Sequence, residues 1–196
     1  VFVQSGGIFE ASDLGQKCAI SHTTATRYLQ ILTELLVLYE VRPFSGSRTA
    51  EIIRAPRYYG FDTGFVTYFK GWGELRTDDM GFLWEHLVIN EIVSHAGRQI
   101  LRYWRTKQGH EVDFVLVPRG AASTPIAIEC KLQERHFDPG HLFLFRKYYP
   151  QGTNLALCSD TLRPHVKRFK DLEIQFLNLQ HLEAFLESVK LPLTAG

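Results

Sequence analysis

The sequence predicts a mixed α/β (α+β) chain in two parts, a helical N-terminal module that ends in a hairpin and then a sheet flanked by helices. Apolar residues at helical spacing dominate residues 12–36, whereas short apolar runs alternate with helical segments between residues 81 and 190. The chain has 196 residues, of which 45% are hydrophobic and 22% are charged. This is ordinary globular composition, with room for one large or two small domains.

Residues 1–65 are expected to form helices followed by a hairpin. The segment SDLGQKCAIS predicts a short helix and turn, and Ser21 can cap the following helix because its hydroxyl can accept hydrogen bonds from free backbone N–H groups. Two strands around an SGS turn are expected within residues 38–61. This order is the winged-helix pattern, whose second helix commonly enters the major groove of DNA. That helix should bury a stripe made of Ala25, Tyr28, Leu29, Leu32, Leu35 and Leu36.

Candidate nucleic-acid contacts lie on the second helix and in the hairpin. Thr23, Thr26 and Arg27 fall outside the buried stripe. Residues 1–70 carry seven Lys or Arg against six Asp or Glu, so no strong positive field marks this module. DNA binding therefore stands beside a second interpretation, in which the winged helix docks a protein or acts as a spacer. The hairpin within residues 38–61 would be the wing of this module. The cations expected in it are Arg42, Arg48, Arg54 and Arg57.

A connector is expected at residues 66–80, before a second, α/β domain at residues 81–196. The apolar patterns place one sheet in this domain with helices packed against it. Its expected elements are a helix at 81–96, strands at 100–106, 111–117 and 125–132, a helix at 139–149, a strand at 153–158, a helix at 162–170, a strand at 173–178 and a helix at 179–189.

Acidic residues interrupt two of the apolar runs, VDFVLV and PIAIEC. Because side chains alternate across a strand, Glu129 and Lys131 share one face of the second run. The short connection favours neighbouring strands, which would bring Asp113 close to Glu129. Two carboxylates in contact repel unless a proton or a cation lies between them, and oxygen ligands of this kind favour Mg²⁺ or Mn²⁺. On the first run, Asp113 is expected opposite the face of Val112, Phe114 and Leu116.

A third acid lies on the helix expected at 81–96. At about 100° per residue, Glu85 falls within the most apolar arc of GFLWEHLVINEIV, whereas His86 falls on the polar arc. A glutamate aimed at a core needs a partner. We expect Asp113 and Glu129 to lie close enough for one cation to bridge them, with Glu85 and Lys131 opening onto the same cleft. The alternative is a ladder of surface ion pairs, which predicts no such convergence.

This set of residues resembles the PD-(D/E)XK nuclease superfamily. GFLWE is similar to the G-x-x-x-E that opens the first helix in archaeal Holliday-junction resolvases, EVDFVL supplies the strand aspartate, and IECK supplies the E-x-K. The proline of the motif name is absent, because Val112 precedes Asp113, and no Gln-x-x-x-Tyr follows on the next helix.

A resemblance over nearly the whole chain is to the C-terminal half of a bacterial and archaeal AAA-type ATPase family. It rests on the winged-helix pattern followed by RYYGFDTG, GFLWEHLVINEI, LRYWRTKQGHEVDFVL and IAIECK. The resemblance implies an N-terminal ATPase domain that binds ATP and is missing here, since no GxxxxGK[ST] loop occurs in this sequence and the chain opens abruptly at Val1. That domain is an expected partner, and a homo-oligomer is left open.

The superfamily resemblance implies a mechanism of phosphodiester hydrolysis in DNA. Glu85, Asp113, Glu129 and Lys131 would be the catalytic residues. Arg102, Arg105 and Lys107, just before Asp113, could hold flanking phosphates, or they could form a solvated strand edge. The competing interpretation is a catalytically silent module that binds DNA or a partner protein and regulates the ATPase domain. The implied ligands of Mg²⁺ or Mn²⁺ are Glu85, Asp113, Glu129 and the backbone carbonyl of Cys130.

The cysteines indicate a reducing compartment, and the hydropathy pattern indicates no membrane helix. Three cysteines at wide spacing form neither a disulfide framework nor a zinc motif, which is typical of a cytoplasmic protein. No apolar run approaches the roughly 18 residues of a membrane helix, so no membrane partner is expected.

Overall fold

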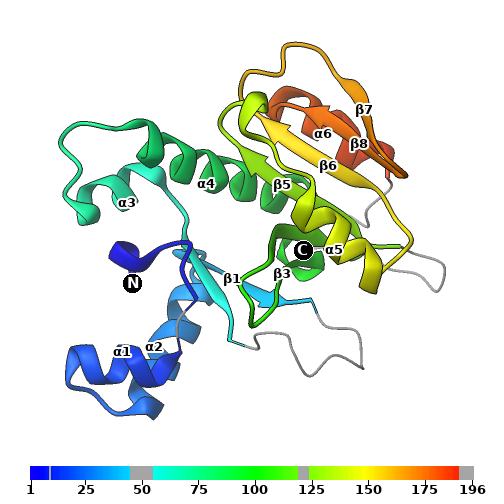
Figure 1. The fold of residues 1–196 in the computed structure, drawn as a ribbon. Helices are drawn as coiled ribbons and strands as arrows, with labels where there is room; N and C mark the ends of the chain where they lie inside the picture. The colour runs from blue at the N-terminus through cyan, green and yellow to red at the C-terminus, as the bar shows by residue number, and fades with distance from the viewer. Residues whose placement is uncertain (9, 45–54, 119–123, 190–196) are drawn as a thin grey trace.

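The computed structural model describes residues 1–8, 10–44, 55–118 and 124–189 (Figure 1). Its helices are α1 (Ala11–Cys18), α2 (His22–Glu34), α3 (Thr63–Lys70), α4 (Thr77–Ala96), α5 (Gly140–Tyr148) and α6 (Leu179–Ser188). Short 3₁₀ turns are η1 (Phe2–Gln4), η2 (Arg98–Ile100) and η3 (Glu134–His136). The strands are β1 (Leu38–Pro43), β2 (Arg57–Gly60), β3 (Leu101–Arg105), β4 (Glu111–Leu116), β5 (Ile126–Lys131), β6 (Asn154–Cys158), β7 (His165–Phe169) and β8 (Leu172–Leu177).

One mixed sheet of eight strands runs through the described chain, in the order β2-β1-β3-β4-β5-β6-β8-β7. The pairings β2–β1, β3–β4, β4–β5 and β8–β7 are antiparallel, and the other three are parallel. The predicted α/β class is therefore confirmed. The two strands of the N-terminal part belong to the same sheet as the rest, because Arg42 and Pro43 of β1 pair with Arg102 and Tyr103 of β3.

The N-terminal helices begin as the sequence indicates. The hydroxyl of Ser21 accepts a hydrogen bond from the backbone N–H of Thr24 at 3.1 Å, which satisfies one free donor at the start of α2. Helices α1 and α2 pack on β1 and β2 around a small core of Leu14, Ala25, Leu29, Leu38 and Tyr58.

The buried stripe of α2 is narrower than predicted. Tyr28, Leu35 and Leu36 were expected inside, but they are 55%, 67% and 52% exposed. Tyr28 lies about 60° from Ala25 around the helix, at the edge of the stripe. The helix ends at Glu34, and Leu36 adopts a left-handed backbone with φ of 58°, so the last two leucines leave the helical face.

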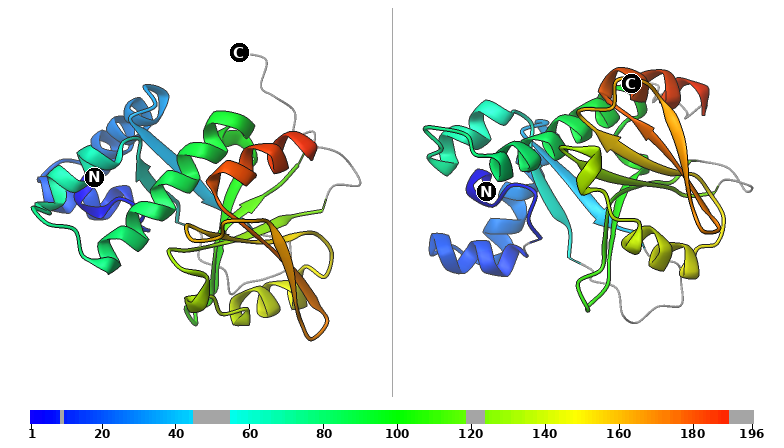
Figure 2. Two further views of the ribbon diagram at one scale, coloured as in Figure 1. Left: turned by 90° about the horizontal axis from the view of Figure 1, so that it is seen from above. Right: turned by 45° about the horizontal axis from the view of Figure 1, so that its top comes forward.

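Helices cover both faces of the sheet (Figure 2). On one face α4 and α6 enclose the larger core, in which Val88, Ile89 and Ile92 pack against Phe114 and Ile128. On the other face α5 encloses a second core of Leu142 and Phe145 with Val115, Ala127 and Ala156. Strands β4 and β5 lie in the middle of the sheet, with α4 and α6 on one face and α5 on the other.

Residues 162–170 were expected to form a helix, and this is wrong. They contain β7, which pairs antiparallel with β8 at the edge of the sheet, with Phe169 opposite Leu172. Lys170 takes the left-handed conformation in the tight turn between these strands, with φ of 57°. The backbone hydrogen bonds of β7 therefore come from a partner strand, and local spacing gives no sign of that pairing.

Helix α4 begins earlier than predicted. Its first residue is Thr77, because Asp79 accepts hydrogen bonds from the backbone N–H and the guanidinium of Arg76 and so caps the start. Part of the expected connector 66–80 is also helical, since α3 continues to Lys70. Although α4 has 20 residues, no helix of the described ranges combines the length and the apolar content needed to cross a membrane.

Candidate functional site

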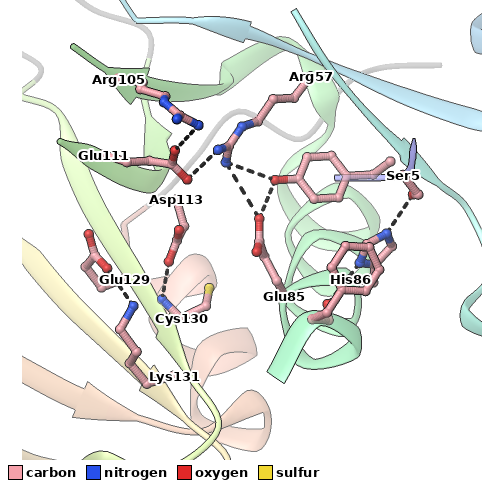
Figure 3. A network of polar contacts seen from close by, with 12 residues as sticks. Ser5, Arg57, Glu85, His86, Arg105, Glu111, Asp113, Glu129, Cys130 and Lys131 are labelled. Carbon is pink, nitrogen blue, oxygen red and sulfur yellow. Dashed lines mark hydrogen bonds and ion pairs between the residues drawn. The ribbon is translucent and has the colours of Figure 1, made fainter. Parts of the chain in front are cut away.

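Strands β4 and β5 are neighbours, as the short connection between them predicted. They pair antiparallel with Phe114 opposite Ile128 and Val115 opposite Ala127. One step along this register, Asp113 and Glu129 follow on the two adjacent strands. The sheet therefore brings the two acids of the sequence pattern to the same level (Figure 3).

A β-bulge positions Asp113. Where β4 pairs with β3, Val115 lies opposite Arg102 but Val112 lies opposite Trp104, so Asp113 and Phe114 together face the single residue between. A bulge bends the strand and re-aims its side chains. The carboxylate of Asp113 accepts a hydrogen bond from the backbone N–H of Cys130 at 2.8 Å.

The bulge also overturns one expectation about strand faces. Val112 was expected on the face of Phe114 and Leu116, but it packs in the α5-side core with Val115. Strict alternation fails there because the strand carries an extra residue.

Glu129 and Lys131 form a pair, as strand alternation predicted. The ammonium of Lys131 donates a hydrogen bond to Glu129 Oε2 at 3.1 Å. Glu129 is 1% exposed, and among the described residues its Oε1 has no hydrogen-bond partner. His141 Nδ1 of α5 lies 3.9 Å from that oxygen. A buried carboxylate oxygen without a donor is costly, and a cation would satisfy it.

The electrostatics of this pair follow from burial. Burial raises the pKa of Glu129 well above its ordinary value, and the charge of Asp113 adds to the shift. Burial raises the pKa of Asp113 as well, while Lys131 and the Cys130 N–H oppose that shift. For Lys131, burial works against the charged form, but Asp113 and Glu129 outweigh it and raise the pKa. Lys131 is therefore a permanent cation at neutral pH.

The core-facing Glu85 has partners, as expected of a glutamate in an apolar arc. Its carboxylate accepts a hydrogen bond from the hydroxyl of Tyr59, and Arg57 Nη1 lies 3.8 Å from Glu85 Oε1. Burial raises the pKa of Glu85 to about 7, and the charge of Asp113 adds to this shift, while Arg57 and the Tyr59 hydrogen bond oppose it. Glu85 is thus the acid of the cluster that titrates near neutral pH.

Arg57 was expected as one of the cations of the wing, but its side chain is buried. It is 5% exposed and points into the acidic cluster (Figure 3). Its guanidinium pairs with Glu111 and Glu85 and lies over the Tyr103 ring, 4.9 Å from the centroid. Glu111 also accepts from Arg105 at 3.0 Å.

Sequence reasoning missed Arg57, Tyr59, Glu111 and His141, although one signal was available. A charged residue inside an apolar strand pointed to Asp113 and Glu129. The same criterion applied to RYYGF would have selected Arg57. Its partners, however, lie on other strands and on α4, and nothing local identifies them.

A second contact fixes β2 to α4 beside this cluster. His86 was expected on the polar arc of α4, but it is fully buried. Its Nε2 lies 2.7 Å from the hydroxyl oxygen of Ser5, which also accepts a hydrogen bond from the backbone N–H of Gly60. Burial lowers the pKa of His86 to about 4, so it stays neutral. The N-terminal segment, β2 and α4 are therefore held together next to Tyr59 and Glu85.

The predicted acids gather around Asp113 without forming a compact metal cage. The charge of Asp113 raises the pKa of both Glu85 and Glu129. Glu85 comes from α4, whereas Glu129 lies on the α5 side, because its neighbours Ile128 and Cys130 pack in the α4-side core. Within the described chain, three ligand atoms within 4.8 Å of one another are found at Glu91, His95 and Glu183, and not among these acids.

The other predicted contacts remain dispersed. Thr23, Thr26 and Arg27 are exposed on α2, and Lys107 is exposed in the turn between β3 and β4. Arg105 is partly exposed and pairs with Glu111. Arg48 and Arg54 lie outside the described residues.

Comparison with known proteins finds matches over both parts of the chain. Residues 80–170 match a domain of unknown function (DUF4143). Residues 1–76 match another domain of unknown function (DUF8612). The two ranges meet where α4 begins.

Two uncharacterized mycobacterial proteins are similar to this chain, Rv2008c of Mycobacterium tuberculosis and Mb2031c of Mycobacterium bovis. Each is 30% identical over 112 residues, which is 55% of this chain and 25% of the relative. The chain thus spans about a quarter of the length of the curated relatives it matches.

Proposed function

We propose that the chain is a metal-dependent phosphodiester hydrolase domain joined to a nucleic-acid-binding winged-helix module, within a longer protein that also carries an AAA-type ATPase domain. The observation that carries the proposal is the orphaned Oε1 of the buried Glu129, beside Asp113 and Lys131. The length of the mycobacterial relatives supports a longer protein.

The donor set fits a hard divalent cation at two of the acids. Asp113 and Glu129 would hold Mg²⁺ or Mn²⁺, since the charge of Asp113 raises the pKa of the buried Glu129 and one oxygen of Glu129 is unpartnered. Such an ion, when bound, would lower the pKa of a water and offset charge on the phosphate. Glu85 is already held by Arg57 and Tyr59, so it fits a supporting role rather than direct ligation.

Three further residues would each have a separate role in the reaction. Lys131 stays protonated, so it offers a positive charge to a phosphate oxygen and is not a general base. Glu85, with a pKa of about 7, can hold or release a proton at neutral pH. Arg57 sets the charge balance of the cluster through Glu85 and Glu111.

The test is cleavage of plasmid and branched DNA with Mn²⁺ or Mg²⁺. Lys131→Ala should abolish cleavage, while Lys147→Ala, at an exposed lysine of α5, should leave it unchanged. Titration calorimetry should show Mn²⁺ binding that Asp113→Asn removes and that Asp171→Asn, at an exposed turn, retains. Metal binding that survives in Asp113→Asn would refute the site, and parallel RNA substrates would establish the nucleic acid.

A second candidate is the catalytically silent module that binds DNA or a protein and regulates the ATPase domain. The observation in its favour is Arg57, whose guanidinium supplies a built-in cation to Glu85 and Glu111. A protein charge in that place lessens the need for a metal. Under this function wild-type protein would bind no Mn²⁺ at the cluster and cleave nothing, and Arg57→Met would create a weak cation site.

A further inference from the structure

A cleft of about 610 Å³ lies away from the acidic cluster, between α2 and the paired strands β1 and β3. Its lining residues come from the N-terminal helices and strands and from the segment of η2 and β3. Its charged and polar walls include Gln30, Glu34, Glu40, Arg42, Arg98 and Arg102.

Two of these arginines are forced side by side. Arg42 and Arg102 are register partners in the parallel pairing of β1 with β3, so their side chains leave the same face of adjacent strands. Strands lie about 4.8 Å apart, and like charges directly opposite each other are destabilising. Burial lowers the pKa of Arg102, and the charge of Arg42 lowers it further. An anion between the two guanidinium groups would relieve this repulsion.

Arg98 and Arg102 donate hydrogen bonds to neutral backbone carbonyls, so their charges are not neutralised by these contacts. Arg102 Nη1 donates to the backbone carbonyls of Gln99 and Leu101, and Arg98 donates to the carbonyl of Thr33 at the end of α2. Among the described residues, no carboxylate forms an ion pair with Arg98 or Arg102.

The two acids of the cleft are already engaged. Glu34 accepts from the side-chain amide of Gln30 at 2.8 Å. Glu40 accepts from Arg42 at 3.1 Å and from the hydroxyl of Tyr58 at 3.3 Å. The side chain of Arg42 is 70% exposed, so this ion pair contributes little and Arg42 is free to turn toward a ligand. Three cations against two occupied carboxylates leave the cleft positive.

We propose that this cleft binds the phosphate backbone of a nucleic acid, with Arg42 and Arg102 sharing one phosphate. The guanidinium fork matches phosphate oxygens bidentately. The opposite wall is the polar side of α2, with Thr26 and Gln30, which is the helix expected to contact DNA. The inference rests on the nucleic-acid binding in the proposed function and assigns it to a cleft rather than to an exposed helix face.

The experiment is fluorescence anisotropy with a short labelled DNA duplex over a series of salt concentrations, in EDTA so that no cleavage occurs. The double variant Arg42→Met/Arg102→Met should weaken binding about tenfold or more at low salt and reduce the slope of log K against log salt by about 0.9 for each arginine. Arg163→Met, at an exposed arginine before β7, removes the same charge elsewhere and should change neither. Arg42→Met alone keeps the test open if the double variant unfolds.

Two results would overturn the inference. One is wild-type affinity and salt slope in the arginine variants. The other is arginine-dependent stabilisation of the protein by pyrophosphate without any duplex binding, which would make the occupant a small phosphate compound. Cleavage is measured separately with the Lys131→Ala variant, because Lys131 does not line the cleft. Arginine-dependent binding without cleavage would therefore reject the hydrolase and keep the cleft, and the reverse pattern would reject the cleft alone.

Discussion

Replacing Arg57 with methionine removes the only guanidinium that reaches Glu85 among the described residues, and it should destabilise the fold in a pH-dependent way. The side chain is buried, pairs with two carboxylates and lies over Tyr103. Removing one partner of a buried ion pair leaves an uncompensated charge and costs about 3–5 kcal/mol. Methionine keeps much of the apolar volume, so most of this loss should come from the charge.

The pH dependence follows from Glu85. Arg57 holds the pKa of Glu85 down, so its removal raises that pKa above about 7. Each further pKa unit on Glu85 adds about 1.4 kcal/mol to the difference between the stability lost at high pH and the stability lost at low pH. Near pH 5.5 Glu85 is protonated in both the wild type and the Arg57→Met variant. The loss in free energy of unfolding should therefore be smaller at that pH and come mainly from the unpaired Glu111.

The assay is urea unfolding of the wild type and the variant at pH 5.5 and pH 8, followed by circular dichroism. A shift of the unfolding midpoint reports a change in stability when the dependence of the free energy on urea concentration is the same in both proteins. Arg42→Met, which removes an exposed guanidinium, should change the free energy of unfolding by less than about 1 kcal/mol. An Arg57→Met loss of less than about 1 kcal/mol at pH 8, or an equal loss at both pH values, would refute this account of the cluster.

Three further changes test separate features. In wild type the folded state holds the Glu85 proton more tightly than the unfolded chain, so the free energy of unfolding should fall by at most ~3 kcal/mol as pH rises from 4.5 to about 7. Glu85→Gln should flatten that decline in urea titrations, and an unchanged decline would contradict the assignment. Gly152→Ala should cost more than about 3 kcal/mol in the same assay, because φ is +119° and the new Cβ would lie 2.0 Å from the Pro125 carbonyl oxygen. Gly109→Ala, with φ of +91° and open space, should cost less, and equal losses would remove the steric argument. Ser21→Ala should lose about 1 kcal/mol through the missing cap of α2, which a wild-type urea midpoint would disprove.

Local chemistry was enough to locate much of the candidate site. Strand alternation paired Glu129 with Lys131, and the short connection made β4 and β5 neighbours. The helical period correctly placed Glu85 in an arc that needs a polar partner. These features depend on backbone geometry within a few residues, so the sequence alone specifies them.

Features that depend on pairing between distant segments were missed. Residues 162–170 form an edge strand because β8 supplies the hydrogen bonds, and their local pattern did not indicate this. The bulge at Asp113 arises from the register between β3 and β4, and it moved Val112 to the other face. A one-residue change of register reverses which face a side chain occupies.

The sequence by itself determined most of the elements, the Ser21 cap and the acids on the middle strands. Only the tertiary structure decided that β1 joins β3 and so carries β2 and Arg57 to α4. That single parallel pairing makes Arg57 a buried partner of Glu85 instead of a wing residue, and it places Arg42 beside Arg102 in the cleft. The physical reason is that periodicity constrains which face a residue takes on its own element, whereas its partners are set by long-range strand pairing, which leaves no local signature.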